Sequence, residues 1–228
     1  MKIRKRKLLV ILLVTSQLGC MLFGLASAAG WLHRAVSDML EARVAAEGRS
    51  LVHELAAKTS RIADGPVEPG TPRWEELQSL IESVDVPYDG FASAFRYDTG
   101  ALVCHSALRE DPELLRLFPG RVFVEMHGDV APLTAAMHSR VERGESLLAG
   151  EIVFDGQLQR MTAYALPRMN AVLAVHQSDE AVEKAINRRL GLSGDAGWLR
   201  AHGVDYRRRL PADHLYRESL RELASPCE

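Results

Sequence analysis

The feature that most constrains this chain is an uncharged, mostly apolar run from Leu8 to Leu32. As a helix, this run would span about 37 Å, which exceeds the roughly 30 Å thickness of a bilayer's hydrocarbon core. The basic stretch Lys2–Lys7 precedes the run, and nothing comparable follows closely. By the positive-inside rule, we expect the N-terminus in the cytoplasm and residues 33–228 outside it. The predicted location is therefore the inner membrane, crossed once, with most of the chain in the periplasm.

Two other interpretations of this apolar run stay open. Ala26-Ser27-Ala28 has the small-x-small form of a signal-peptidase site, and cleavage after Ala28 would release a soluble protein. However, the run is longer than the usual signal-peptide core of about 7–15 residues, which favours an uncleaved anchor. Cys20 is a weak candidate for a lipoprotein cysteine, because Gln17 stands where an aliphatic residue is expected.

The charges are divided unevenly along the chain. Six of the 28 basic residues and none of the 30 acidic residues precede residue 35, which leaves a net charge of −8 for residues 35–228. A segment with this balance has no general attraction for phosphate backbones, so we expect no nucleic-acid partner.

Motifs for catalysis or metal binding are missing from the sequence. It has no CxxC cluster, HExxH helix, GxSxG turn or phosphate-binding GxxxxGK[ST] loop. Cys104 and His105 are neighbours on a predicted strand, so their side chains point to opposite faces and cannot act as a nucleophile–base pair. We therefore predict a protein that is not an enzyme and that holds no metal and no cofactor.

After residue 30, the spacing of apolar residues predicts a long helix to about Ala63 and a shorter one over 74–84. Thr71 and Pro72 are suited to begin the second helix, as its N-cap and its first-turn proline. The period of the apolar residues then changes to two, which predicts strands. Predicted strands cover 91–97, 101–106, 121–127, 150–154, 158–166 and 171–176, and further helices cover 112–117, 131–143, 178–190 and 212–223.

The fold class that this order predicts is α+β, with an antiparallel sheet of about five strands flanked by helices and a long N-terminal helix that continues from the membrane. The expected divisions are a cytoplasmic N-terminus (1–7), a transmembrane helix (8–32), a helical stem (33–64), a sheet domain (65–190) and a C-terminal tail with a short helix (191–228).

The faces of the sheet follow from the pairing of the first predicted hairpin. If Phe95 opposes Val103, one face carries larger and polar residues and the other carries small ones. The larger face would hold Phe91, Ser93, Phe95, Tyr97, Val103 and His105, and the other Ala92, Ala94, Arg96, Leu102 and Cys104. In the second hairpin, Arg160, Thr162 and Tyr164 would share one face, and Met161, Ala163 and Ala165 the other. We expect the long helix to pack on the alanine face and the opposite face to line a pocket beneath residues 107–143.

Three segments together resemble the Cache family of extracytoplasmic sensor domains, relatives of PAS domains found in sensor kinases and chemoreceptors. They are FASAFRYDTGALVCHS (91–106), LLRLFPGRVFVE (114–125) and the final strands with their exit helix (150–186). The resemblance as a whole covers about residues 31–190. The resemblance implies a PAS-like sheet and a small-molecule ligand, such as a carboxylate or an amino acid. The chain departs from the family at Ser106, where proline usually follows the histidine. It also departs at Leu190, which leads to a tail rather than back to the membrane. We therefore expect either a membrane signalling partner or a stand-alone or truncated relative of the family.

Five residues are candidates for ligand binding. His105 falls at a strand end beside Ser93 on the predicted pocket face. A hydroxyl from Tyr164 and a guanidinium from Arg160 could hold a carboxylate. Arg121, after a Pro-Gly step, could reach the pocket mouth. Each has an ordinary structural alternative: a histidine that closes a strand, a core tyrosine, or arginines in solvent.

The predicted function is a membrane-anchored sensory module that binds a small ligand outside the cytoplasm and signals through its helical stem and a partner protein. The apolar positions of residues 31–63 also favour a parallel homodimer through this stem. The alternative is a structural or assembly protein of the cell envelope, whose helix and acidic domain bind another protein.

Overall fold

The computed structural model describes residues 2–62, 65–107, 109, 122–126, 129–154 and 157–189, and for residues 2–13, 153, 154 and 157 it describes the backbone alone. The predicted helices at 112–117 and 212–223, and the tail 191–228 as a whole, lie outside these residues, as does Arg121.

The centre of the fold is a seven-stranded sheet in which all neighbouring strands are antiparallel, with the order β2-β1-β7-β6-β5-β3-β4. Its strands are β1 (Phe91–Arg96), β2 (Leu102–His105), β3 (Phe123–Met126), β4 (Asp129–Pro132), β5 (Leu147–Phe154), β6 (Gln157–Leu166) and β7 (Ala171–Ser178). The α+β class is confirmed, but the count of about five strands is wrong. One reason is β4, whose four residues overlap the start of the helix predicted at 131–143 and carry too short a pattern to indicate a strand.

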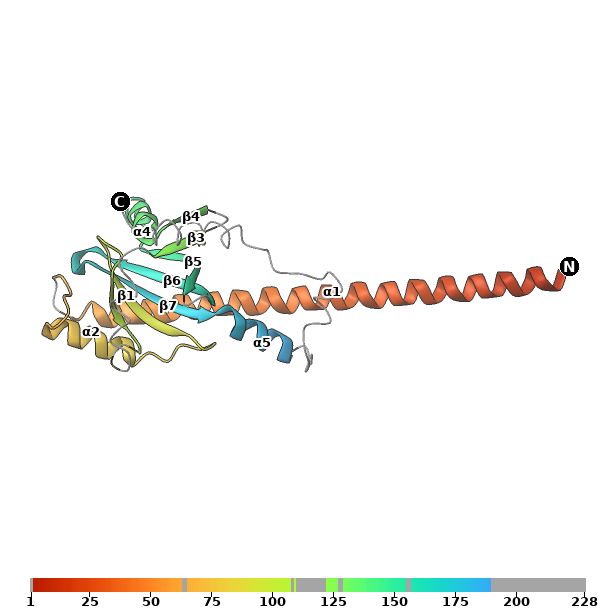
Figure 1. Cartoon of the computed structure of the whole chain (residues 1–228), viewed down its shortest axis with the longest axis horizontal. Coiled ribbons are helices and arrows are strands. Elements are labelled where there is room, and N and C mark those ends of the chain that lie inside the picture. The colour runs from red at the N-terminus through yellow and green to blue at the C-terminus, as the bar shows by residue number, and fades with distance from the viewer. Residues whose placement is uncertain are drawn as a thin grey trace, which may run out of the picture.

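The longest element, α1 (Lys2–Thr59), is a single helix of 58 residues that extends far beyond the sheet (Figure 1). No proline interrupts it, and it ends close to the predicted limit at residue 63. Its last third is built into the protein through residues at helical spacing, which include the buried Leu40, Val44, Val52 and Leu55. Among the described residues, no helix combines the length and the apolar character needed to cross a membrane.

The described part of the chain also contains four shorter helices: α2 (Pro72–Glu82), α4 (Leu133–Glu142), the 3-10 turn η1 (Pro167–Met169) and α5 (Asp179–Arg189). The predicted start of α2 is confirmed, because the backbone N–H of Trp74 donates to Oγ1 of Thr71 at 3.2 Å and Pro72 occupies the first turn. Ser178 caps α5 in the same way, since its Oγ accepts from the N–H of Ala181 at 3.3 Å.

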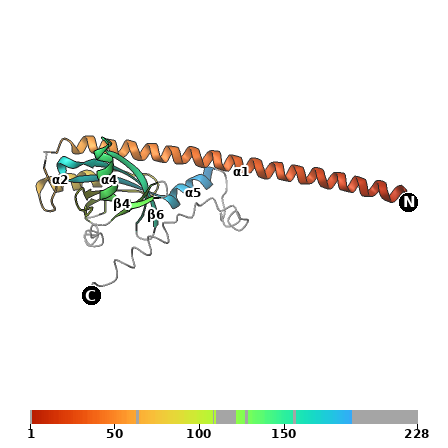
Figure 2. The same cartoon turned by 90° about the horizontal axis from the view of Figure 1, so that it is seen from above.

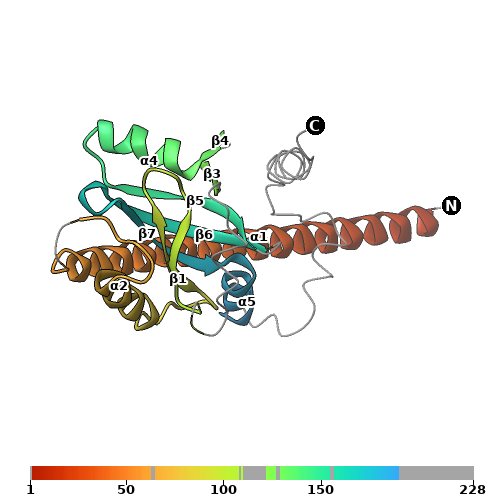
Figure 3. The same cartoon turned by 60° about the vertical axis from the view of Figure 1, so that its left-hand side comes forward.

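The sheet has two faces with separate cores. The near face packs against α1 and α2, and the far face packs against α4 (Figures 2 and 3). Near-face core residues include Val52, Leu55, Leu77, Ile81, Ala92, Ala94, Leu173 and Val175. Far-face core residues include Phe95, Leu102, Leu133, Met137, Met161, Ala163, Val172 and Ala174. The alanine face of β1 therefore meets the long helix, as predicted.

Gly48 allows this close approach. A Cβ atom at Gly48 would lie 2.9 Å from Oγ1 of Thr162 on β6 and 3.1 Å from Oε1 of Gln177 on β7. A larger side chain would require the side chains of Thr162 and Gln177 to move or α1 to shift away from the sheet, because packed interiors leave little room for added atoms.

The last described helix, α5, lies beside α1 (Figure 1). Val182 and Ile186 of α5 form a small core with Leu40 and Val44 of α1. The chain thus enters the sheet domain along α1 and leaves it through α5, which lies beside the same helix. The predicted boundary at residue 64 separates segments that share one core, since Val52 and Leu55 pack with residues of the sheet.

Candidate functional site

Two histidines, a serine and a phenylalanine gather on the far face of the sheet, and we call these residues (Phe91, Ser93, His105 and His176) the histidine cluster. In the sheet register, Ser93 lies opposite His105 and Phe91 lies opposite His176. The ring of Phe91 stacks on that of His176, with centroids 4.4 Å apart, and tilts against that of His105 at 4.7 Å. Ser93, His105 and His176 are all buried.

His176 is a neutral imidazole inside the protein. Burial, and secondarily the nearby His105, lower the pKa of His176 to about 3. Its Nε2 lies 2.8 Å from Oγ of Ser93, whereas its buried Nδ1 has no hydrogen-bond partner among the described residues. A buried unsatisfied nitrogen costs about 1–3 kcal/mol, so a hydrogen bond to Nδ1 of His176 would stabilise the folded protein.

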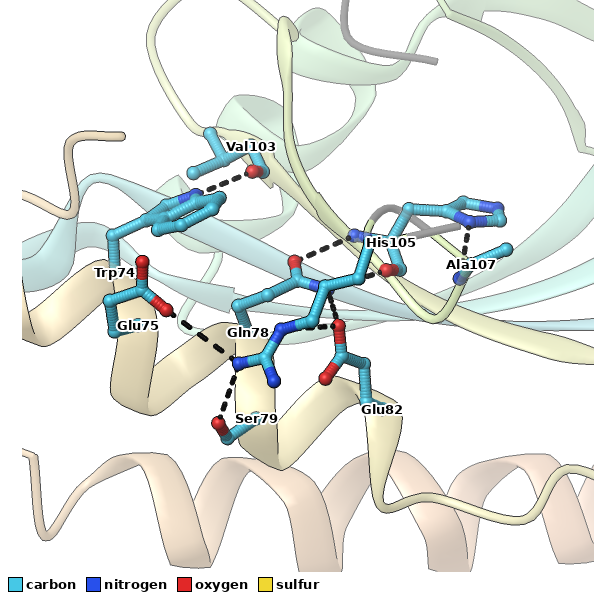
Figure 4. Close-up of polar contacts among 9 residues, drawn as sticks. Trp74, Glu75, Gln78, Ser79, Glu82, Val103, His105 and Ala107 are labelled. Carbon is cyan, nitrogen blue, oxygen red and sulfur yellow. Dashed lines mark hydrogen bonds and ion pairs between the residues drawn. The ribbon is translucent and has the colours of Figure 1, made fainter. Parts of the chain in front are cut away.

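The backbone of His105 is held from the outer side of β2, which is an edge strand of the sheet. The side chain of Gln78 on α2 donates from Nε2 to the carbonyl of His105 at 2.8 Å and accepts from its N–H at 3.3 Å. The indole N–H of Trp74 donates to the carbonyl of Val103 at 2.8 Å. Figure 4 shows that the imidazole of His105 points away from Gln78. The α2 side chains therefore fix the strand and leave the ring on the far face.

The same helix also binds the chain that follows β2. The guanidinium of Arg109 lies 3.1 Å from Glu82 and 3.6 Å from Glu75, and it donates to Oγ of Ser79 at 3.1 Å. Within this set, Glu82 also accepts from Nε2 of Gln78 at 2.7 Å. The polar groups that position His105 are therefore linked to the start of the segment after residue 107.

The structure divides the predicted site residues between the two faces. Ser93 and His105 lie together on the far face, as predicted. The prediction that Arg160 and Tyr164 share this face is wrong. Tyr164 packs against the near-face core, with its ring 5.3 Å from that of His53 on α1, and Arg160 contacts Glu41 of α1. Arg121 lies outside the described residues.

Two physical causes explain why some residues lie on the face opposite to the predicted one. The sequence contrast between small and large residues does not mark one face throughout the sheet. On the near face, α1 approaches Thr162 of β6 closely because the helix carries Gly48 at that point. In the first hairpin, a bulge between Ala94 and Phe95 changes the register. Phe95 pairs with Leu102 rather than Val103, so Leu102 joins the far-face core and Val103 the near-face core.

Sequence reasoning missed His176 as a site residue. A signal was present, because a lone histidine interrupts the apolar strand Ala171–Ser178, in which every residue is buried. What the sequence does not give is the pairing of β7 with β1, which brings His176 beside Ser93 from far along the chain.

Among the described residues, no group of three or more histidine, cysteine, aspartate or glutamate side chains is placed to hold a metal ion. Burial strongly raises the pKa of the Cys104 thiol, which keeps this cysteine protonated and unreactive.

A hollow lined by Leu51, Lys58 and Asp85 lies between α1 and the α2–β1 connection. It is on the near side of the sheet, whereas the sequence predicts a pocket on the opposite face.

Compared with models of protein families and with curated proteins, the chain matches none. The Cache resemblance therefore stays a prediction.

Proposed function

We propose that this protein is a membrane-anchored sensory module of Cache-like, extracytoplasmic type. In this proposal, residues 8–32 cross the membrane as the N-terminal part of α1. A small ligand binds at the histidine cluster on the far face, and the change is passed through α1 to a membrane partner protein.

The observation that carries the proposal is the continuity of α1. One unbroken helix joins the apolar N-terminal run to the core of the sheet domain. Large apolar side chains on its N-terminal part are more than half exposed, for example Phe23 at 76% and Trp31 at 72%. A helix with such a surface needs an apolar environment, and a bilayer supplies one on all sides of it.

The histidine cluster supports a ligand site because it combines buried polar atoms with an unsatisfied one. Its link to α1 runs through α2. Gln78 holds the backbone of His105, and the neighbouring Leu77 and Ile81 pack in the same near-face core as Val52 and Leu55 of α1. A ligand that prefers one position of β2 would therefore shift the populations of α2 and α1 together.

A thermal-shift screen of the full chain in lipid nanodiscs tests the ligand site. We expect at least one compound in a panel of amino acids and small carboxylates to stabilise the protein, by about 2.7 kcal/mol at 100 times its dissociation constant. His105→Ala and Ser93→Ala should abolish the stabilisation. The matched control is His138→Ala, because His138 lies on α4 with its Nε2 3.1 Å from the carbonyl of Tyr97, outside the cluster.

Topology is tested separately with reporter fusions at the C-terminus. A periplasm-active reporter should work and a cytoplasm-active one should not. A cytoplasmic C-terminus, or a mature chain cleaved after Ala28, would contradict the anchored module. No stabilising compound, together with a stably co-purifying envelope protein, would favour the assembly function instead.

A further inference from the structure

Five charged side chains from five elements meet where the near face joins α1 and α5. We call them the Arg160 junction: Glu41 of α1, Glu125 of β3, Glu151 of β5, Arg160 of β6 and Asp179 of α5. In the sheet register, Glu125 lies opposite Glu151 and Glu151 lies opposite Arg160, so the three share one face. Asp179 and Glu41 contact the guanidinium, Glu151 lies beside it on the neighbouring strand β5, and Glu125 lies one strand further, on β3. The residue that β7 adds to the same row, Gln177, is uncharged.

Arg160 connects the sheet to both helices of the stem. Its Nε and Nη2 donate to Oδ1 of Asp179 at 2.9 and 2.8 Å, and its Nη2 lies 3.4 Å from Oε1 of Glu41. Asp179 is the first residue of α5. The side chains of Arg160 and Asp179 are only about a quarter exposed, so solvent screens this ion pair less than a surface pair. One guanidinium therefore attaches β6 to the beginning of α5 and to α1.

Glu151, on β5, is the cross-strand neighbour of Arg160. Burial is the main cause that raises the pKa of the Glu151 carboxyl; Arg160 lowers it, and the charges of Asp179, Glu125 and Glu41 raise it further. Burial also raises the pKa of Glu125, whose Oε2 is buried without a hydrogen-bond partner among the described residues. Burial thus favours protonation of a carboxyl group that lies directly across the strand pair from the connecting arginine.

We propose that the Arg160 junction is a proton-sensitive attachment between the sheet and its stem. When Glu151 is ionised, it draws Arg160 away from Asp179 and Glu41, and when Glu151 is protonated, the arginine is left to these two partners. Acidification therefore strengthens the docking of α5 and α1 on the sheet. Its use as a signal rests on the proposed sensory function, whereas the proton sensitivity does not.

The sign follows from linkage. A carboxyl whose pKa is higher in the folded protein binds its proton more tightly there than in the opened state. Its stabilising contribution is present at acid pH and is lost as the pH rises through the folded pKa. The relevant window begins at the ordinary glutamate value of 4.5 and extends upward. Opening of α5 should accordingly be rarer at pH 5.5 than at pH 7.5.

Hydrogen exchange of the α5 amides, read by mass spectrometry on the full chain in nanodiscs, tests the proposal. After correction for intrinsic exchange rates, we expect α5 in the wild type to be at least about threefold better protected at pH 5.5 than at pH 7.5, relative to β7 in the same sample. Glu151→Gln, which mimics the protonated group, should give strong protection at both pH values. The matched control is Glu76→Gln, because Glu76 is an exposed glutamate on α2, and it should behave as the wild type.

Retention of the wild-type pH dependence in Glu151→Gln would overturn the proposal. If Glu151→Gln does not fold, Glu125→Gln provides the second test, because removing one repelling charge should move the transition in α5 protection to lower pH. Failure of either variant to alter the pH dependence leaves the ligand and topology tests untouched. Failure of those tests, with the pH effect intact, leaves a proton-sensitive stem without the proposed sensory role.

Discussion

At the scale of single residues, His176 determines how the core responds to acid. Its imidazole is fully buried beside Ser93 and Phe91, and its pKa is lowered to about 3 because burial disfavours the charged form. The unfolded chain instead binds a proton near the ordinary value of 6.5. Between these two values the unfolded state holds more protons, so the folded protein loses stability as the pH falls. This effect is opposite in sign to that of Glu151.

We expect His176→Gln to flatten the acid side of the stability curve. Each proton bound only by the unfolded state costs up to about 1.4 kcal/mol per pH unit, so the wild type should lose roughly this amount from pH 6 to pH 5 through His176. Urea denaturation of both proteins at pH 5, 6 and 7 measures the difference. His138→Gln serves as the control, and an unchanged slope in His176→Gln would show that His176 is not the residue responsible.

At the scale of elements, α2 covers the open edge of β2. An edge strand presents unpaired N–H and C=O groups that can pair with another chain. Here Gln78 bonds both backbone groups of His105, and Trp74 bonds the carbonyl of Val103 (Figure 4). Side chains of a helix thus take the place of a further strand, and they fix the position of the histidine cluster at the same time.

Gln78→Leu should therefore damage both stability and the site. Leucine fills a similar volume but leaves the N–H and the carbonyl of His105 without their partner, which we expect to cost about 2 kcal/mol or more. Chemical denaturation gives this value, and exchange of the His105 amide should accelerate beyond that of β7. Glu76→Leu, an exposed change within one turn of Gln78 on α2, is the matched control. Equal stability of Gln78→Leu and the wild type would contradict the role of Gln78 at this edge.

Elements were easier to predict than their pairing. The hairpin strands, α2 with its Thr71 cap and α5 after Ser178 follow from local periodicity and capping, which a single stretch of sequence contains. The face of Arg160 and the partner of His176 depend on contacts between segments distant in the chain. Phe91, Ser93 and His105 could be placed on one face from the sequence because all three lie in one hairpin. The fourth member of the cluster, His176, could not, because it reaches the cluster only through the pairing of β7 with β1.

At the scale of the whole molecule, α1 has two parts with different surroundings. From Leu40 onward it contributes to the cores, whereas the large apolar side chains from Val14 to Leu32 are exposed. The sheet domain should therefore not depend on the first part for its stability.

Deletion of residues 1–33 should leave the melting temperature of the sheet domain within about 3 °C of the full-length value, since 1 kcal/mol corresponds to about 2–4 °C at this size. Deletion of residues 1–48 removes Leu40 and Val44, against which Val182 and Ile186 of α5 pack, and should lower it much further. Calorimetry of the two truncated chains provides the comparison. Unfolding of the chain that lacks only residues 1–33 would show that the first part of α1 supports the fold.

The interior strand β7, third in the order of the sheet, is the last strand in the described chain, and it joins β1 to β6. During synthesis from the N-terminus, β1 with β2 and the strands from β3 to β6 emerge before the strand that unites them. Until then they form two unfinished sheets with open edges, and their contacts of high sequence separation make closure slow. Such a chain exposes aggregation-prone edges for longer than one built from local contacts. Its biogenesis should consequently rely on a holding chaperone until residue 178 has emerged.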